Sequence, residues 1–315
     1  MEIFLSFALV LVGFFLIVKG GNFLVRSALA LSRLSGIPTV VVGATFVSLA
    51  TTLPEIVISI YAILTQHEGL AVGNAVGGML VSFSLIFALY AVLGTRPVTR
   101  DKLFLKSVFL FLSIGLVVIF SMDGRISMWE GFILGGIYFA YIALTSKGRG
   151  TTQAPVESHP TETKRQVFSG FLIGQLLLLF GAFLLVQNSE RLAIDLGISE
   201  TIVGLTLVAV GTSMPELVTV VGSVRHKSGD LAIGNIVGSN IINATLLLGL
   251  CGVVGAMHGA PLAIAPTTLF IAIPALVIAS LVALVPILIK GRVFRAQGIV
   301  LLALFAIYIV ALIFI

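Results

Sequence analysis

The stretch SLATTLPEIVISI, residues 48–60, places two threonines, Pro54 and Glu55 inside an apolar segment that is long enough to cross a membrane. An ionised glutamate at the centre of a membrane helix costs about 2.5–3.5 kcal/mol on insertion scales. Pro54 adds a second defect, because proline removes the backbone hydrogen bond to the carbonyl four residues earlier, here that of Ala50. A segment of this kind needs a compensating interaction.

The composition of the chain is that of an integral membrane protein. Of its 315 residues, 58% are hydrophobic and 10% are charged, whereas about a quarter of the residues of a soluble domain are charged. The net charge of +5 would favour nucleic acid in a soluble protein. Here the sorting of basic residues to the membrane faces explains it, so we expect no nucleic-acid partner. Cys251 is the single cysteine, which excludes a disulfide framework and a thiolate metal site.

Ten apolar segments have the length of a membrane-spanning helix. They cover residues 3–32, 38–65, 71–94, 104–121, 129–145, 167–194, 200–224, 231–256, 263–289 and 296–314. The first lacks a basic leader and a small-residue cleavage site, so we expect a retained helix and not a signal peptide. The polar stretch 146–166 is interpreted as a surface linker. The sequence therefore predicts an all-α integral membrane protein of ten transmembrane helices, divided into a first five-helix repeat at 1–145 and a second at 167–315.

The basic residues predict the orientation of these helices. The odd-numbered connections between segments hold Arg33, Arg96, Arg100, Lys102, Lys106, Lys147, Arg149, Lys164, Arg165, Arg225, Lys227, Lys290, Arg292 and Arg295. The even-numbered connections hold only Arg125 and Arg191. The positive-inside rule then places the odd connections, including the 146–166 loop, in the cytoplasm and both termini outside the cell membrane.

The two halves of the chain repeat each other. The stretch GATFVSLATTLPEIV (43–57) aligns without gaps with GLTLVAVGTSMPELV (204–218), a shift of 161 residues that pairs Glu55 with Glu216. The same shift aligns AVGNAVG (71–77) with AIGNIVG (232–238). Because five helices precede the second copy, that copy enters the membrane from the opposite side. We therefore expect an inverted-topology repeat with a substrate site near the middle of the membrane.

The paired segments supply oxygen atoms that suit a cation. Their matched residues are Thr51, Thr52 and Glu55 in the first repeat and Thr212, Ser213 and Glu216 in the second. Hydroxyls, carboxylates and carbonyls freed by proline are hard ligands, which favour Na⁺ or Ca²⁺ over soft metals. The alternative is that each glutamate only packs between helices or reaches toward the membrane surface. The repetition of the whole pattern argues against that alternative.

A second polar segment follows in each repeat, at Asn74 and at Asn235. The glycines around them have the spacing that lets membrane helices approach closely, so we expect those glycines to pack between helices. For the two asparagines, ion ligation and hydrogen bonding between helices both stay open. Ser239 and Asn243 are four residues apart, on one helical face, and can face a cation together.

The two (G/A)T(T/S)xPE segments, each followed by GN(A/I)VG, resemble the α-repeats of the cation/calcium antiporter superfamily, above all its prokaryotic sodium/calcium exchanger branch. The resemblance covers essentially the whole chain. It implies a transporter, not an enzyme, that exchanges Na⁺ for Ca²⁺ by alternating access and needs no cofactor. The implied ligands are Thr51, Thr52, Glu55, Thr212, Ser213, Glu216 and Ser239, with backbone oxygens near Ser48 and Ala209.

One departure from the family pattern concerns the coupling ion. The family usually has GSNI followed by Asn or Asp in both repeats, and residues 238–243 match it here. The first repeat instead has Gly78, Met79 and, at the final polar position, Ser82. We expect at least one sodium site to be weakened or lost as a result. A proton/calcium antiporter of the same fold is therefore the alternative function.

The expected mechanism groups the second, third, seventh and eighth helices around the glutamates, with the long first and sixth helices rocking or sliding against them. Besides calcium and sodium ions, the expected partner is membrane lipid, and the sequence indicates no obligatory protein partner. Two other functional classes stay open. A cation channel would use the same carboxylates without countertransport, and an intramembrane enzyme would need a nucleophile or catalytic dyad that the sequence does not display.

Overall fold

Helices make up nearly all of the described chain in this computed structural model, which describes residues 2–37, 39–93, 100–147, 163–195, 202, 204–259 and 261–314. The first half contains α1 (Glu2–Ser35), α2 (Thr39–Val42), η1 (Gly43–Val47), α3 (Ser48–Leu64), α4 (Glu68–Val81), η2 (Ser82–Phe87), α5 (Ala88–Leu93), α6 (Arg100–Ser121), β1 (Arg125–Ile126) and α7 (Met128–Lys147). The second half contains α8 (Lys164–Asp195), η3 (Gly204–Val208), α10 (Ala209–Thr212), α11 (Met214–Arg225), α12 (Gly229–Ile242), η4 (Asn243–Leu247), α13 (Leu248–Met257), β2 (Leu262–Ala263), η5 (Thr268–Ala272), α14 (Ile273–Lys290) and α15 (Arg295–Ile313).

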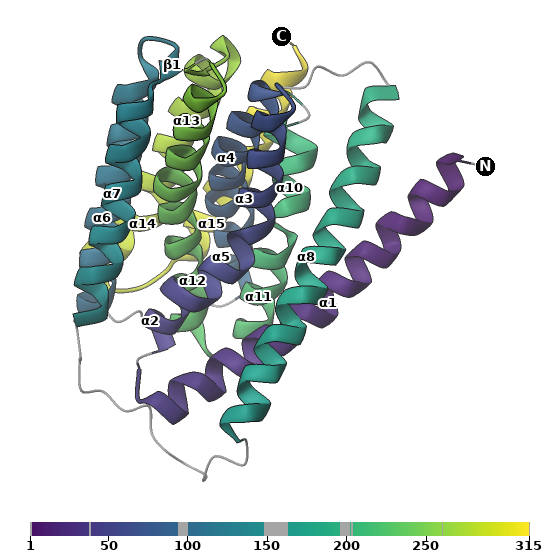
Figure 1. The fold of residues 1–315 in the computed structure, drawn as a ribbon. Coiled ribbons are helices and arrows are strands. Elements are labelled where there is room, and N and C mark those ends of the chain that lie inside the picture. The colour runs from purple at the N-terminus through teal and green to yellow at the C-terminus, as the bar shows by residue number, and fades with distance from the viewer. Residues whose placement is uncertain are drawn as a thin grey trace.

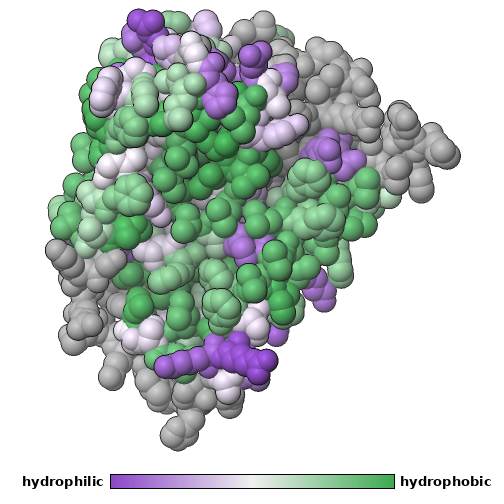
Figure 2. Space-filling view, in the orientation of Figure 1, coloured by the Kyte–Doolittle hydropathy of each residue, from purple (hydrophilic) through white to green (hydrophobic). Residues whose placement is uncertain are grey.

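The described helices confirm the membrane class and most of the predicted segments. Nine of them are long and apolar enough to cross a membrane, and the helices that contain these spans begin and end within a few residues of the expected segments. Their apolar residues dominate the middle of the face in Figure 2, and hydrophilic residues gather toward its upper and lower ends. The predicted segment at 200–224 overlaps η3, α10 and α11, but residues 196–201 and 203 lie outside the described ranges. The count of ten helices therefore stays a prediction, and the linker falls largely on residues 148–162, also outside those ranges.

One predicted boundary is wrong. The ninth segment was expected to begin at residue 263, but helical structure there starts at Pro266 and continues into η5. Leu262 and Ala263 instead form β2, which pairs with β1 in an antiparallel two-stranded sheet. The backbone groups of these residues are therefore bonded to another strand, which hydropathy alone does not predict.

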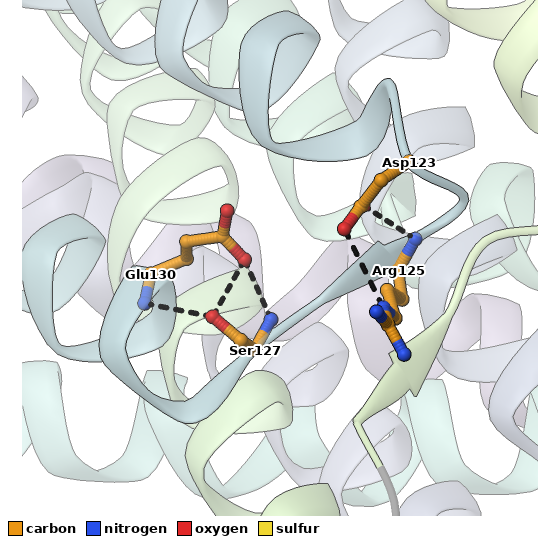
Figure 3. A network of polar contacts seen from close by, with 4 residues as sticks. All are labelled: Asp123, Arg125, Ser127 and Glu130. Carbon is orange, nitrogen blue, oxygen red and sulfur yellow. Dashed lines mark hydrogen bonds and ion pairs between the residues drawn. The ribbon is translucent and has the colours of Figure 1, made fainter.

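The same end of the bundle holds a small polar network, shown in Figure 3. Ser127 precedes α7, and its backbone N–H and hydroxyl both donate to Glu130 Oε2 at 2.7 Å. The backbone N–H of Glu130 in turn donates to Ser127 Oγ at 3.4 Å, which completes a capping box. Arg125 pairs with Asp123 at 3.4 Å, and both side chains are exposed. These contacts lie in the turn between α6 and α7 and at the start of α7.

Short π-helical turns interrupt the helices at matching places in the two halves. The turn η1 corresponds to η3, and η2 corresponds to η4, when the chain is shifted by 161 residues. A tyrosine from the last helix of each half supports η1 or η3: Tyr141 donates to the carbonyl of Ala44 at 2.9 Å, and Tyr308 donates to that of Leu205 at 3.3 Å. A structural repeat is expected to place π-helical turns at corresponding positions, and here η1 and η3 are each also bonded to a tyrosine from the last helix of their half.

The helices α1 and α8 lie side by side and lean away from the rest of the bundle in Figure 1. Glycines let their backbones touch. A Cβ built on Gly20 would lie 2.7 Å from the carbonyl oxygen of Gly174, and one built on Gly181 would lie 2.7 Å from that of Gly13. Shifting either contact by 161 residues gives the other, so this crossing also follows the repeat. The small residues therefore let α1 and α8 pack closely along their crossing.

We predict that Gly174→Ala destabilises the protein by about 1–3 kcal/mol, because its Cβ would lie 2.9 Å from the backbone oxygen of Gly20 and neither backbone can yield cheaply. The matched control is Gly136→Ala in α7, where a Cβ meets nothing within 4 Å. Equilibrium unfolding in mixed detergent measures both. Equal stability of the two variants would contradict the close crossing of α1 and α8.

Candidate ion-binding site

Glu55 and Glu216 are buried in the middle of the bundle, at 1% and 2% exposure. Glu55 lies on α3, just after Pro54, and Glu216 lies on α11, just after Pro215. Each accepts a hydrogen bond from the opposite repeat: Thr52 Oγ1 donates to Glu216 Oε1 at 3.3 Å, and Ser213 Oγ donates to Glu55 Oε1 at 3.5 Å. Thr52 and Ser213 each lie three residues before a glutamate, so these crossed bonds bring the two carboxylates to one place.

Only one of the two oxygens of each carboxylate accepts a side-chain hydrogen bond from the described residues. The second oxygen, Oε2, is buried and accepts no hydrogen bond from the residues that the structure describes. A buried ionised carboxylate without full compensation is costly. Two such oxygens at one place therefore present negative charge that a bound cation would neutralise.

A second pair of crossed bonds joins the threonines to the asparagines. Thr51 Oγ1 donates to Asn235 Oδ1 at 3.2 Å, and Thr212 Oγ1 donates to Asn74 Oδ1 at 2.9 Å. Asn74 Nδ2 also donates to the carbonyl of Glu55 at 3.3 Å and to Ser59 Oγ at 3.0 Å. Asn74 therefore bonds between helices with both ends of its amide. Asn235 Nδ2 has no partner among the described residues.

The two predicted backbone ligands lie beside these threonines. The carbonyl of Ser48 accepts from Thr51 Oγ1 at 3.3 Å, and the carbonyl of Ala209 accepts from Thr212 Oγ1 at 3.3 Å. Both residues are buried. Glycines of the opposite repeat pack against them, because a Cβ on Gly238 would lie 2.6 Å from Ser48 Oγ and one on Gly77 would lie 2.8 Å from the Cβ of Ala209. The packing role expected for these glycines is what the structure has.

The remaining predicted ligands show where the two repeats differ. Ser82 Oγ accepts a bond of 2.7 Å from Asn240 Nδ2, whereas its counterpart Asn243 has an Oδ1 without a partner among the described residues. Ser239 Oγ donates to the carbonyl of Ile236 at 3.2 Å. A Cβ on Gly78, the counterpart of Ser239, would lie 3.4 Å from Asn243 Nδ2 and 3.7 Å from Ser213 Oγ. Gly78 therefore lies beside the site but brings no hydroxyl to it.

The proline defects are handled differently in the two repeats. In the second, α10 ends at Thr212 and α11 begins at Met214, with Ser213 between them at φ −80° and ψ 1°. In the first, α3 continues through Pro54. The carbonyl of Ala50 that Pro54 leaves unbonded accepts from Gln175 Nε2 on α8, at 2.8 Å. The sequence-based site omitted Gln175 and Asn240. Gln175 does show a signal, since it stands alone among apolar residues in FLIGQLLLLF (171–180).

The oxygens gathered here define what the site can bind. They come from two carboxylates and from neutral hydroxyls, amides and carbonyls, which is the ligand set of Na⁺ and Ca²⁺. Among the described residues, no three His, Cys, Asp or Glu side chains form a group that could hold a metal. The site therefore depends on two carboxylates supplemented by neutral oxygens.

The chain is similar to membrane exchangers along nearly its whole length. A family model described as "Sodium/calcium exchanger protein" matches residues 5–147 and 166–314. The inner membrane protein YrbG of Escherichia coli (strain K12) is 34% identical over 78% of this chain and 79% of its own length. The sodium/calcium exchanger MaX1 of Methanosarcina acetivorans is 28% identical over 98% of this chain and 99% of its own length.

The fold agrees with these similarities. A solved structure of the sodium-calcium exchanger NCX_Mj, soaked with Na⁺ and Ca²⁺, has a TM-score of 0.80 to this chain at 27% identity, covering 97% of this chain and 98% of that one. The intramembrane-enzyme hypothesis is thereby removed. The chain belongs to the sodium/calcium exchanger family and is a multi-pass membrane transporter of that kind.

Proposed function

We propose that the chain exchanges Na⁺ for Ca²⁺ at a single site formed by Glu55 and Glu216, which opens alternately to the two sides of the membrane. The observation that supports this most directly is the crossed pair of hydroxyl bonds, at 3.3 and 3.5 Å, which joins the buried carboxylates and leaves one oxygen of each without a partner. Ca²⁺ and Na⁺ would compete for those oxygens. Because occupancy by one excludes the other, the same site serves both directions of exchange.

The ligand set that we propose has two shells. Thr51, Thr52, Thr212 and Ser213 lie in hydrogen bonds around the carboxylates and would turn their hydroxyl oxygens to an ion. The carbonyls of Ser48 and Ala209, with Ser239 and Asn243, would complete it. Asn74 and Asn235 already bond between helices, so we assign them to holding the threonines in place.

The proposed architecture is an inverted pair of five-helix repeats, 1–145 and 167–315, joined by a cytoplasmic loop at 146–166. The reciprocal contacts at the site, at η1 and η3, and at the α1–α8 crossing support it. Both chain ends lie in the upper half of Figure 1, whereas α7 ends and α8 begins toward the lower end. With the basic residues of the odd connections at the cytoplasmic face of the cell membrane, both termini would be extracellular.

The alternating motion is assigned to the α1–α8 pair. Its glycine crossing makes it one unit, and α1 packs on α11 with a Cβ built on Gly21 only 2.5 Å from Val218. The pair therefore contacts the helix that bears Glu216. A movement of this unit across the core would open one face of the site and close the other.

A proton/calcium antiporter is the second candidate, and the first repeat favours it. Gly78 offers no hydroxyl, and Ser82 is engaged by Asn240 at 2.7 Å. This side of the site thus has fewer free oxygens for a second cation. A proton bound to one carboxylate would neutralise its negative charge in place of a sodium ion for which this side of the site has too few ligands.

We predict that Glu55→Gln or Glu216→Gln reduces radioactive Ca²⁺ uptake into sodium-loaded proteoliposomes to near background, because a neutral amide cannot balance the charge of Ca²⁺. The control is Glu130→Gln, the same chemical change at a capping box that glutamine also fills. Full uptake by either site variant would refute the proposed carboxylate pair.

The coupling ion is tested by imposing Na⁺, H⁺ and K⁺ gradients one at a time on proteoliposomes that hold the unaltered chain. We expect Ca²⁺ uptake with the outward Na⁺ gradient alone. Uptake that follows the pH gradient and ignores Na⁺ would establish the proton-coupled candidate. Ca²⁺ flux that needs no counter-ion and carries current would instead show a channel.

We predict that Gly78→Ser lowers the half-saturating Na⁺ concentration about fivefold, if the new hydroxyl supplies about 1 kcal/mol to the bound ion. The nearest atoms to its Cβ, at 3.4 and 3.7 Å, leave room for the side chain. Gly78→Ala is the matched control, since it adds the Cβ without the oxygen. A serine variant that behaves as the alanine variant does would show that Gly78 lies outside the sodium shell.

A further inference from the structure

Gln175 connects the α1–α8 pair to the ion site through a buried hydrogen bond. Its side chain is 8% exposed, and Nε2 donates to the carbonyl of Ala50 at 2.8 Å. That carbonyl is the one whose helical donor Pro54 removes, and it immediately precedes Thr51. A side chain from another helix thus replaces the missing backbone donor at the point where α3 presents its ion ligands.

The position of Gln175 along α8 ties it to both long helices. The adjacent Gly174 packs against α1 at the glycine crossing. A Cβ built on Gly174 would lie 2.9 Å from the carbonyl oxygen of Gly20. Two backbones packed too closely to admit a Cβ leave little room for one helix to slide along the other, so we expect the pair to move together. When the pair moves, Gln175 therefore moves with it.

The described part of the second repeat shows no equivalent of this bond. Shifting Gln175 back by 161 residues gives Phe14 on α1, and shifting Ala50 forward gives Gly211, whose carbonyl loses its helical donor to Pro215. A phenylalanine side chain has no hydrogen-bond donor. In an inverted repeat, the oppositely facing conformation would give α1 the role that α8 has here. Phe14 would then stand in the place of Gln175, so the hydrogen bond would not form.

We propose that Gln175 is a positioning residue that couples the α1–α8 pair to the ion site and favours the described conformation over the oppositely facing one. This rests on the proposed alternating access, in which the pair moves against α3. A hydrogen bond of 2.8 Å does not survive a displacement of more than about an ångström. Loss of one buried hydrogen bond then changes the ratio of the two conformations about threefold to tenfold.

The test is Gln175→Met, which keeps the side-chain length and removes the donor. Right-side-out and inside-out vesicles report the half-saturating Ca²⁺ concentration at each face, measured by self-exchange of radioactive against unlabelled Ca²⁺. Self-exchange needs no sodium, so the measurement holds whichever ion drives transport. Gln166→Met is the matched control, because Gln166 is an exposed residue of the same helix whose side chain bonds only to Thr163 among the described contacts.

We expect the two half-saturating concentrations to move in opposite directions, so that their ratio changes about threefold to tenfold. A purely structural defect would lower the amount of active protein and leave that ratio unchanged. Gln175→Asn, which keeps an amide but is too short to reach Ala50, should shift the ratio in the same direction. An unchanged ratio in both variants, or two values that move together, would overturn the proposal. A separate measurement tests the proposed function itself. If the Glu55→Gln variant still carries out Ca²⁺ self-exchange, the proposed ion site is wrong, whatever the result for Gln175.

Discussion

The burial of two carboxylates in the middle of a membrane bundle is the constraint on which the rest of the structure depends. An ionised group at that depth is costly unless partners compensate for it. The chain compensates Glu55 and Glu216 only in part, with one crossed hydroxyl bond to each and no bond to the second oxygen from the described residues. In the proposed cycle, a cation supplies the rest. Without a bound cation, the change between the two conformations would then be unfavourable. Transport of one ion would therefore require transport of the other in the opposite direction.

The prolines place oxygen atoms where the carboxylates need neighbours. Each removes one helical hydrogen bond a turn before a glutamate. In the second repeat the helix breaks at Ser213, whose hydroxyl donates to Glu55. In the first, α3 stays helical, and Gln175 donates to the carbonyl of Ala50 that Pro54 leaves without its helical donor. The same local defect therefore has two structural outcomes, and the continuous helix is the one that receives a donor from a neighbouring helix.

Local patterns and the internal repeat were sufficient to predict the membrane class, most helix bounds and the meeting of the two glutamates. They could not predict partners that belong to a third helix. Gln175 and Ala50 are 125 residues apart, and no periodicity links them. Nor could they predict that Asn240 engages Ser82, because both residues are polar and either one could have faced an ion. The start of the ninth helix was missed for the same reason, since the pairing of β2 with β1 is a long-range contact.

An exchanger that alternates between two conformations needs them to be close in energy, and a perfect inverted repeat would make them equal by symmetry. This chain keeps the symmetry around the two glutamates: the carboxylates, their hydroxyl donors and the threonine–asparagine bonds all occur in reciprocal pairs. It departs from symmetry at Gly78, Ser82 and Gln175, around that centre. In the proposed cycle, changes at those positions would alter which ion is held and which face is favoured without removing the two carboxylates. In this chain the proposed cycle therefore assigns charge balance to the symmetric glutamates, and assigns ion preference and conformational preference to the asymmetric residues around them.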